Sequence, residues 1–223
     1  MSTNSESNSK TKITIDVWSD VVCPFCYLGD TILDSALSKF EHADAVEIRY
    51  HSFQLMPEIE PGEAVNLVEH LSKKYGGPEA VEQMNAQIVA RGNQYGIDYR
   101  FDKAITVNTL KAHRLLHFAA EKGVQHSAVM ALFKAYFTEG KNVADTDTLV
   151  DLLQPLGLDA NEIREVADGD RYAELVQADI AAAREIGIQG VPFFVFQEKY
   201  GISGAQPEEM FSQALETVWA ELD

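Results

Sequence analysis

Two stretches of the chain alternate apolar and polar residues, which is the pattern of a β-strand with one buried face. They are Ile13 to Trp18 and Val46 to Leu55. Strand-like residues return at Gly190 to Phe196, followed by the turn-like Gln197-Glu198-Lys199 and then by Tyr200 to Gly204. These last three segments predict an antiparallel β-hairpin near the C-terminus.

Apolar residues at helical spacing separate these strands. One such segment, with apolar positions between Ile32 and Phe40, joins the first two strands. We therefore expect those strands to be parallel, in a right-handed βαβ unit. After Pro57 the pattern stays helical for over a hundred residues, and a last helix opens with Pro207-Glu208-Glu209. The order βαβ, helices, ββα predicts an α/β protein: a thioredoxin fold with an inserted all-helical domain.

The same patterns predict the domain organisation. Residues 1–11 are polar and predict a disordered N-terminal tail. Residues 12–60 form the N-terminal part of the thioredoxin fold, residues 61–170 the helical insertion domain, and residues 171–223 the C-terminal part of the thioredoxin fold.

Composition narrows the possible partners and the compartment. The chain has 223 residues, ample for a hydrophobic core, and a net charge of −17 that argues against nucleic acid and anionic membranes as partners. The N-terminus lacks the apolar stretch of a secretory signal, and no run approaches the length of a transmembrane span. We expect a cytoplasmic protein, and no residue pattern points to a particular oligomeric state.

The first strand leads into a Cys-Pro-Phe-Cys motif that holds both cysteines of the chain, Cys23 and Cys26. Pro24 suits the first turn of a helix, and a sulfur at a helix N-terminus is favoured as the thiolate. Cys26, one helical turn later, can close a disulfide with Cys23. The predicted chemistry is thiol–disulfide exchange, with Cys23 as the nucleophile and Cys26 as the residue that resolves the mixed disulfide.

Three other readings of the cysteine pair are open. The residues could pack in the core, or form an inert disulfide, although a four-residue loop stabilises weakly. They could also be half of a zinc site, completed by His113 and His117, which lie four residues apart. The zinc ligands would then be some ninety residues apart in sequence. We favour redox chemistry and expect no metal.

Two carboxylates near the motif are of interest. A first strand covered on both sides would bury Asp16, whose pKa would rise, making it a candidate proton acceptor for Cys26. A carboxylate in water at the strand edge is the alternative. Asp20, in the active-site loop with Pro24 and Phe25, is expected to be a solvated or capping residue.

The motifs together resemble the DsbA superfamily of thioredoxin-fold oxidoreductases, and more closely its cytoplasmic FrnE-like branch. The resemblance extends from Ile13 over nearly the whole chain. The segments that carry it are S-D-V-V-C-P-F-C-Y-L-G, N-T-L-K-A-H-R-L from Asn108, G-I-Q-G-V-P-F-F-V-F from Gly187, and Y-G-I-S-G-A-Q-P from Tyr200.

The resemblance implies a cis peptide bond between Val191 and Pro192 that faces the disulfide. Pro192 would then shape the substrate site and turn the Val191 backbone toward the sulfurs. It also favours a place for Asn108 and His113 in the wall of the substrate pocket. Phe25 departs from the family, whose members often carry His or Trp at that position, so strong oxidising power is not carried over.

The predicted function is therefore a thiol–disulfide oxidoreductase without a cofactor, acting on a disulfide-containing protein or a small-molecule thiol. Glutathione is a possible substrate. The alternative is a glutathione-dependent isomerase or transferase of the same superfamily, of the hydroxychromene-carboxylate isomerase or kappa-class type. Those enzymes typically carry serine at the nucleophile position, and the intact Cys23–Cys26 pair argues against that class.

Overall fold

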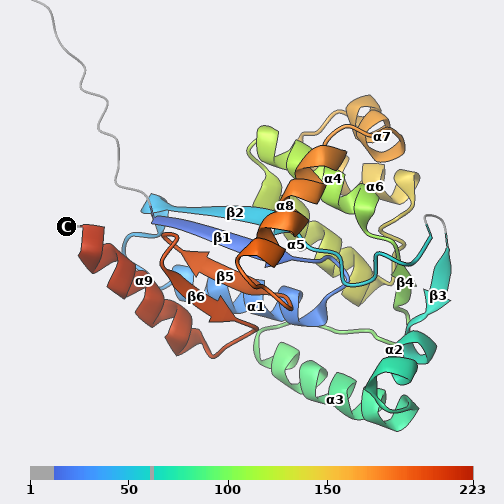
Figure 1. Ribbon diagram of the computed structural model, residues 1–223, viewed down its shortest axis with the longest axis horizontal. Helices are drawn as coiled ribbons and strands as arrows, with labels where there is room; N and C mark the ends of the chain where they lie inside the picture. Colours follow the sequence, from blue (N-terminus) through green and yellow to red (C-terminus); the bar gives the residue numbers. More distant parts are fainter. Residues whose placement is uncertain (1–12, 61–62, 223) are drawn as a thin grey trace, which may run out of the picture.

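A four-stranded sheet forms the centre of the molecule, as the computed structural model shows for residues 13–60 and 63–222 (Figure 1). The predicted N-terminal tail lies outside the described residues. The strand order is β2-β1-β5-β6. β1 (Ile13–Ser19) pairs in parallel with β2 (Val46–Ser52) and antiparallel with β5 (Phe193–Phe196). β5 pairs antiparallel with β6 (Tyr200–Ser203), which confirms the predicted βαβ unit and hairpin.

The turn of the β5–β6 hairpin has the backbone that a tight hairpin requires. Gln197 and Glu198 have φ values of 51° and 55°, in the left-handed region. Two consecutive residues with positive φ match the right-handed twist of the flanking strands.

The two faces of the sheet are covered by different helices (Figure 1). On one face, Ile13, Ile15 and Val17 are fully buried in the core that α1 (Pro24–Leu37) and α9 (Glu208–Leu222) share. On the other face, Trp18 packs with residues of α8 (Ala173–Glu185) and the segment after it. The period of two along β1 therefore sends neighbouring side chains to opposite faces of the sheet.

Helices occupy most of the chain between β2 and β5. Besides α8, they are α2 (Leu67–Tyr75), α3 (Pro78–Gln94), α4 (Leu110–Glu121), α5 (Gln125–Lys134), a π-helical turn (Ala135–Glu139), α6 (Thr146–Leu153) and α7 (Ala160–Asp168). Short 3-10 turns lie at Ala43–Ala45 and Gln154–Leu156. Asp145 and Asp159 cap α6 and α7 by accepting hydrogen bonds from backbone N–H groups of the first turn.

The inserted segment is not all-helical, which corrects the sequence prediction. Ala64–Asn66 forms a strand, β3, instead of the start of a helix, and it pairs antiparallel with β4 (Ile105–Val107). Three-residue strands contain too few positions for alternation to distinguish them from one turn of helix.

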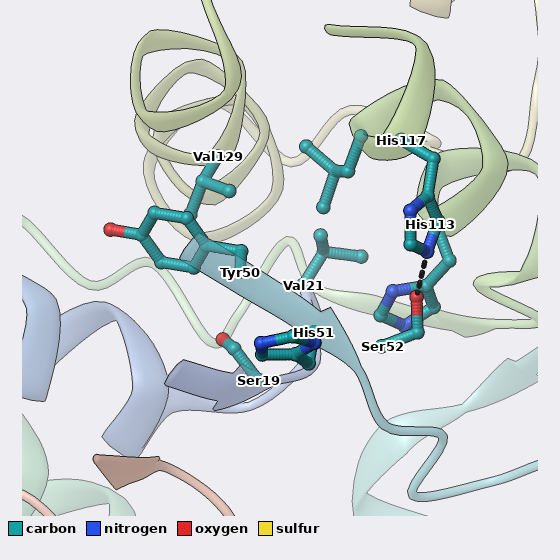
Figure 2. Close-up of a pocket in the computed structure, with 9 residues that line it drawn as sticks. Ser19, Val21, Tyr50, His51, Ser52, His113, His117 and Val129 are labelled. Carbon is teal, nitrogen blue, oxygen red and sulfur yellow. Dashed lines mark hydrogen bonds between the residues drawn. The ribbon is translucent and has the colours of Figure 1, made fainter. Parts of the chain in front are cut away.

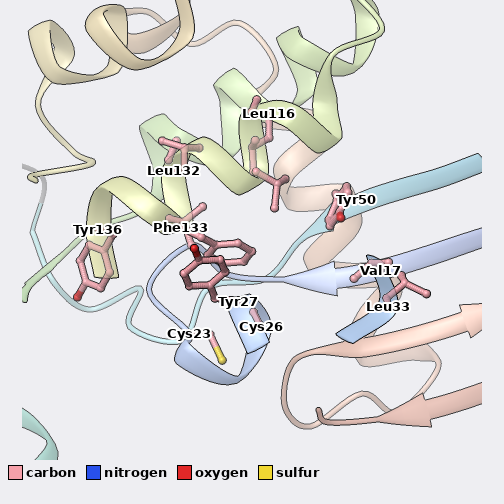
Figure 3. Close-up of a cluster of buried hydrophobic side chains, with 14 of the residues drawn as sticks. Val17, Cys23, Cys26, Tyr27, Leu33, Tyr50, Leu116, Leu132, Phe133 and Tyr136 are labelled. Carbon is pink, nitrogen blue, oxygen red and sulfur yellow. The ribbon is translucent and has the colours of Figure 1, made fainter. Parts of the chain in front are cut away.

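A single aromatic cluster joins α1 to the inserted segment (Figure 3). The Tyr27 ring of α1 stacks on Phe133 of α5 at a centroid distance of 5.2 Å and meets the edge of Tyr99 at 5.8 Å. All three belong to the largest buried hydrophobic cluster, which also contains the β1 side chains. The helical segment and the sheet thus share one core, and the domain boundaries at residues 60/61 and 170/171 stay a prediction.

Candidate active site

The two cysteines lie at the start of α1, where β1 ends (Figure 3). Cys23 is the N-cap residue, with extended backbone (φ −92°, ψ 112°), and Pro24 occupies the first helical turn. Because proline has no N–H to leave unpaired, it fits this position. The Cys23 N–H donates to the Asp20 carbonyl at 2.9 Å, and the Cys26 N–H donates to the Cys23 carbonyl at 3.0 Å. Both thiols are free.

The two thiols have different surroundings. Cys23 borders a cavity, and its Sγ donates to the Val191 carbonyl oxygen at 3.5 Å. Cys26 lies in the first turn of the helix, and its side chain is completely buried. Burial raises the pKa of the Cys26 thiol well above its usual value, and the neighbouring Cys23 sulfur raises it further. A proton on Cys26 is therefore held more tightly than in water.

The loop before β5 packs directly on α1 beside the cysteines. The Val191–Pro192 peptide bond is cis, and the Pro192 carbonyl accepts a hydrogen bond from Gly204 N–H at 2.8 Å. A Cβ added at Gly29 would lie 3.0 Å from Pro192 Cγ and 3.1 Å from Phe194 Cζ. The absence of a side chain at Gly29 is thus what lets α1 approach this loop so closely.

A cavity of about 280 Å³ opens over Cys23 between the loop that carries Val191 and the α2–α3 pair. Its wall is mostly apolar, with Val22, Phe25, Leu55, Met56, Leu67, Leu71, Met84, Phe101, Phe137 and Val191. Among its described lining residues there is no lysine, arginine or carboxylate, and His70 is within 3.6 Å of Glu58. A site of this composition favours an apolar group next to the sulfur.

Asp20 is buried, which corrects the expectation of a solvated residue. Its side chain is 0% exposed, its Oδ2 accepts a hydrogen bond from Leu55 N–H at 2.8 Å, and its Oδ1 lies 3.3 Å from His113 Nε2. Together with its carbonyl contact to Cys23, these bonds fix the loop before the helix to the chain after β2. Asp20 therefore stabilises the loop that carries the cysteines.

The model of the DSBA-like thioredoxin domain family matches residues 14–216. The chain belongs to this family. The narrower resemblance to the FrnE-like branch stays a prediction.

Individual relatives agree with that assignment. The chain is 28% identical over 205 residues to YwbO of Bacillus subtilis, an uncharacterized protein, covering 91% of this chain and 96% of YwbO. It is 37% identical to the crystal structure of SCO1869 of Streptomyces coelicolor, described as a probable DsbA oxidoreductase. That structural match covers 94% of this chain and 91% of the other, with a TM-score of 0.88.

A more distant solved structure shares the fold alone. It is a 2-hydroxychromene-2-carboxylate isomerase, 17% identical, with 94% of this chain and 99% of the other covered and a TM-score of 0.68. The overall fold is therefore shared with a protein that is named as an isomerase, and the fold by itself does not decide the reaction. Among the described residues, no helix has the length and apolar character that crossing a bilayer requires.

Asn108 and His113 do not line the cavity over Cys23, in contrast to what the resemblance implied. Asn108 is buried, donates to the Ile59 carbonyl at 2.6 Å and accepts from Leu110 N–H at 2.9 Å. His113 is 1% exposed and contacts Asp20. Asn108 bonds the segment after β2 directly, whereas His113 reaches it only through Asp20, which accepts from Leu55 N–H. That segment carries Leu55 and Met56 into the cavity wall.

Asp16 is not brought together with Cys26, so its position does not support the predicted role as proton acceptor. Its side chain shares the Trp18 face of β1, opposite to α1, and its Oδ1 accepts from His51 Nε2 at 2.8 Å. The other ring nitrogen of His51 donates to Asp179 of α8 at 2.9 Å. Burial alone would lower the pKa of His51, but these two carboxylates outweigh it and raise the pKa to about 9.

His117, the second histidine of the possible zinc site, also has partners of its own. Its Nε2 lies 3.0 Å from Asp179 Oδ2 and 3.3 Å from Ser52 Oγ, beside a small cavity of about 10 Å³ (Figure 2). Within the described part of the chain, no three His, Cys, Asp or Glu side chains are grouped so that they could hold a metal ion.

One buried carboxyl near the cysteines was not predicted. Asp30 lies on α1, four residues after Cys26, and is 1% exposed. Its Oδ1 accepts a hydrogen bond from the Tyr50 hydroxyl at 3.2 Å, and that hydroxyl lies 2.8 Å from His126 Nδ1. The spacing of four residues from a buried cysteine was a signal in the sequence, because it places two side chains on one face of a helix.

Proposed function

We propose that the protein is a thiol–disulfide oxidoreductase in which Cys23 and Cys26 alternate between dithiol and disulfide. The observation that carries the proposal is the unequal placement of the two sulfurs. Cys23 stands at a helix N-terminus on the wall of a cavity, and Cys26 lies buried behind it. A substrate can reach the first sulfur, and the second is held one helical turn away.

The exchange proceeds in two displacement steps. The Cys23 thiolate attacks a substrate disulfide, forms a mixed disulfide and releases one substrate thiolate. The Cys26 thiolate then attacks Cys23 Sγ, releases the second substrate thiolate and closes the Cys23–Cys26 disulfide. Two electrons pass from the protein to the substrate, and the two thiol protons pass to the released thiolates or to solvent. The reverse sequence oxidises a substrate dithiol.

The loop before β5 supplies the surface against which a substrate would lie. The Val191 carbonyl is within reach of Cys23 Sγ, and Val191 itself lines the cavity. We assign Val191 to substrate binding through its backbone and Pro192 to shaping that surface. An extended segment next to the substrate disulfide would pair with this backbone, as peptides do along an exposed strand edge.

The cavity favours an apolar substrate over glutathione. Glutathione carries two carboxylates, and the described lining residues offer them no lysine or arginine. A disulfide flanked by apolar side chains, in a protein or in a small molecule, matches Phe25, Met56 and Leu67 better. No resident cofactor is needed, since the sulfur pair itself carries the electrons.

A reducing compartment is our proposal for the location. The chain has two cysteines, both in the motif, so no further disulfide contributes to its stability. Proteins of the cytoplasm rarely depend on structural disulfides.

Trapping tests this function. In Cys26→Ser the first displacement should proceed and the second should stop, so mixed disulfides through Cys23 should accumulate and run as reducible adducts on a gel. Cys23→Ser is the matched control, and it should form no adduct and show no exchange. A glutathione-dependent isomerase acting through another group would keep its turnover in both variants, and activity of Cys23→Ser would refute the assignment.

A further inference from the structure

A chain of four side chains leads from the interior of α1 to the surface. Asp30 Oδ1 accepts from the Tyr50 hydroxyl, which lies 2.8 Å from His126 Nδ1, and His126 Nε2 lies 3.2 Å from Asp34 Oδ1. The inner members are buried, with Asp30 1% and Tyr50 5% exposed. The outer members reach water, since the side chains of His126 and Asp34 are 39% and 36% exposed.

The inner end of this chain lies beside the resolving cysteine. Cys26 and Asp30 are both buried on α1, and residues four apart stack on one helix face with Cβ atoms about 6 Å apart. Tyr50 stands on β2, and its hydroxyl meets Asp30, one helical turn after Cys26 (Figure 3). A charge on Cys26 contributes to the raised pKa of Tyr50, which places the two groups within electrostatic reach.

Asp30 has one oxygen to spare. Among the described residues, its Oδ2 is fully buried and has no hydrogen-bond partner. A buried carboxylate oxygen without a donor is costly, and a protonated one is less so. Burial accordingly raises the pKa of Asp30 to about 8; His126 opposes the rise and Asp34 adds to it. The titratable groups around it are Tyr50 from β2, His126 from α5, and Cys26 and Asp34 from its own helix.

We propose that Asp30 accepts the proton of the Cys26 thiol when the mixed disulfide is resolved. Tyr50 and His126 then conduct that proton to the surface at Asp34, because a hydroxyl or an imidazole can accept from one neighbour while donating to the next. The inference rests on the proposed function.

The step balances as follows. The Cys26 S–H bond breaks and an O–H bond forms on the Asp30 carboxylate. The resulting thiolate attacks Cys23 Sγ, the mixed disulfide breaks, and the substrate leaves as a thiolate. Because Cys26 is buried, its thiolate is disfavoured. A base close to the thiol therefore lowers the barrier to attack on Cys23 Sγ.

Stopped-flow mixing of the reduced protein with dithiodipyridine, a neutral aromatic disulfide, separates the two displacements. Each releases one equivalent of coloured thione, first from attack by Cys23 and then from attack by Cys26. Asp30→Asn should leave the first phase unchanged and slow the second about 100-fold at pH values above 8, where Asp30 is mainly the carboxylate that can accept the proton. The inflection near pH 8 in the second-phase rate should vanish.

Two further variants sharpen the result. Tyr50→Phe removes the donor that lowers the pKa of Asp30, so the inflection should move to higher pH. Asp151→Asn, an exposed carboxylate on α6, is the matched control and should change neither phase. If Asp30→Asn does not fold, the role of Asp30 can be tested in the wild-type protein by NMR titration of its isotope-labelled carboxyl group. Its titration midpoint should differ between the dithiol and disulfide forms.

The contrary outcomes are distinct. A second phase with unchanged rate and pH profile in Asp30→Asn, or an Asp30 midpoint that is the same in both redox forms, would overturn the proton-acceptor role. So would equal slowing of both phases, or slowing in Asp16→Asn instead. A wild-type protein that shows no second phase at all would contradict the proposed function itself.

Discussion

On the α1 face of the sheet the Asp30 carboxyl meets a tyrosine hydroxyl, whereas on the α8 face the Asp179 carboxylate meets two imidazoles. Tyr50 is the only side chain that bonds Asp30 among the described residues. Asp179 lies 2.9 Å from His51 and 3.0 Å from His117, and it also accepts from Ser52 N–H at 2.8 Å. Both carboxyls are largely removed from water, and yet their protonation differs.

The contrast shows that the direct partner, more than burial, decides the charge of a carboxyl in this fold. Burial raises the pKa of Asp30 to about 8. Burial would raise the pKa of Asp179 too, but the hydrogen bonds from His117 and His51 outweigh it and lower the pKa. The α8 face thus carries an ion pair that is charged throughout the neutral pH range and holds α8 to the sheet. The α1 face carries a carboxyl that can change its proton near neutral pH, on the side where the cysteines are.

The largest expected effect is on the pH dependence of stability in Asp30→Asn. The folded pKa of about 8 lies above the ordinary value of 3.8, so folding favours the protonated acid. That contribution is fully present below about pH 4 and is lost as pH rises through 8. A gap of about four pKa units corresponds to at most about 5 kcal/mol. In urea titrations, the unfolding free energy of the variant should rise relative to that of the wild type as pH increases from 4 to 8. If the two free energies change with pH in parallel, the pKa of Asp30 is not raised by folding.

The sequence predicted the elements, and the placement of the cysteine pair, that local pattern determines. Alternation and helical spacing were enough for β1, α1 and the β5–β6 hairpin, and the Cys-Pro-Phe-Cys motif was enough to place Cys23 at a helix N-terminus. Pro192 lies where the resemblance put it, on the loop packed against α1.

What the sequence could not give depends on contacts between distant segments. Asp20 sits in a loop and looked solvated, but α4 and the chain after β2 close over it through His113 and Leu55. Asp16 was correctly placed on β1, but the sequence could not show that its side chain meets a histidine and does not reach Cys26. The side chain lies on the face opposite to α1, and the partner there is His51, thirty-five residues later.

A smaller effect, of opposite sign, is expected for Asp179→Asn. Because the pKa of Asp179 is lowered, its contribution is present above about pH 4 and is lost as pH falls below that value. It also fades above about pH 9, where His51 loses its proton. Breaking a buried ion pair costs 3–5 kcal/mol, and the partial exposure of this one reduces the expected loss to about 2–3 kcal/mol. Chemical denaturation should show the deficit at neutral pH and its progressive decline as pH falls below 4 toward the lowered pKa of Asp179, while both dithiodipyridine phases keep their wild-type rates; a deficit that stays constant in acid would mean that packing, not charge, fixes α8.

The smallest effect on stability, with a visible effect on exchange, is expected for Gly29→Ala. Alanine favours a helix interior over glycine by about 1 kcal/mol. Its methyl group would however sit 3.0 Å from Pro192 Cγ and 3.1 Å from Phe194 Cζ, so the loop or the helix must move by a few tenths of an ångström. Overpacking of this kind costs about 1–3 kcal/mol, so after the gain in helix propensity the net loss of stability is about 0–2 kcal/mol. The displaced group is the loop that carries Val191, which contacts Cys23 Sγ, so the first dithiodipyridine phase should slow several-fold although the unfolding free energy falls by no more than about 2 kcal/mol. Ala36→Gly, on the same helix and away from this loop, is the control that loses stability without changing the exchange rate. If Gly29→Ala exchanges at the wild-type rate, the close approach of α1 to Pro192 serves packing alone.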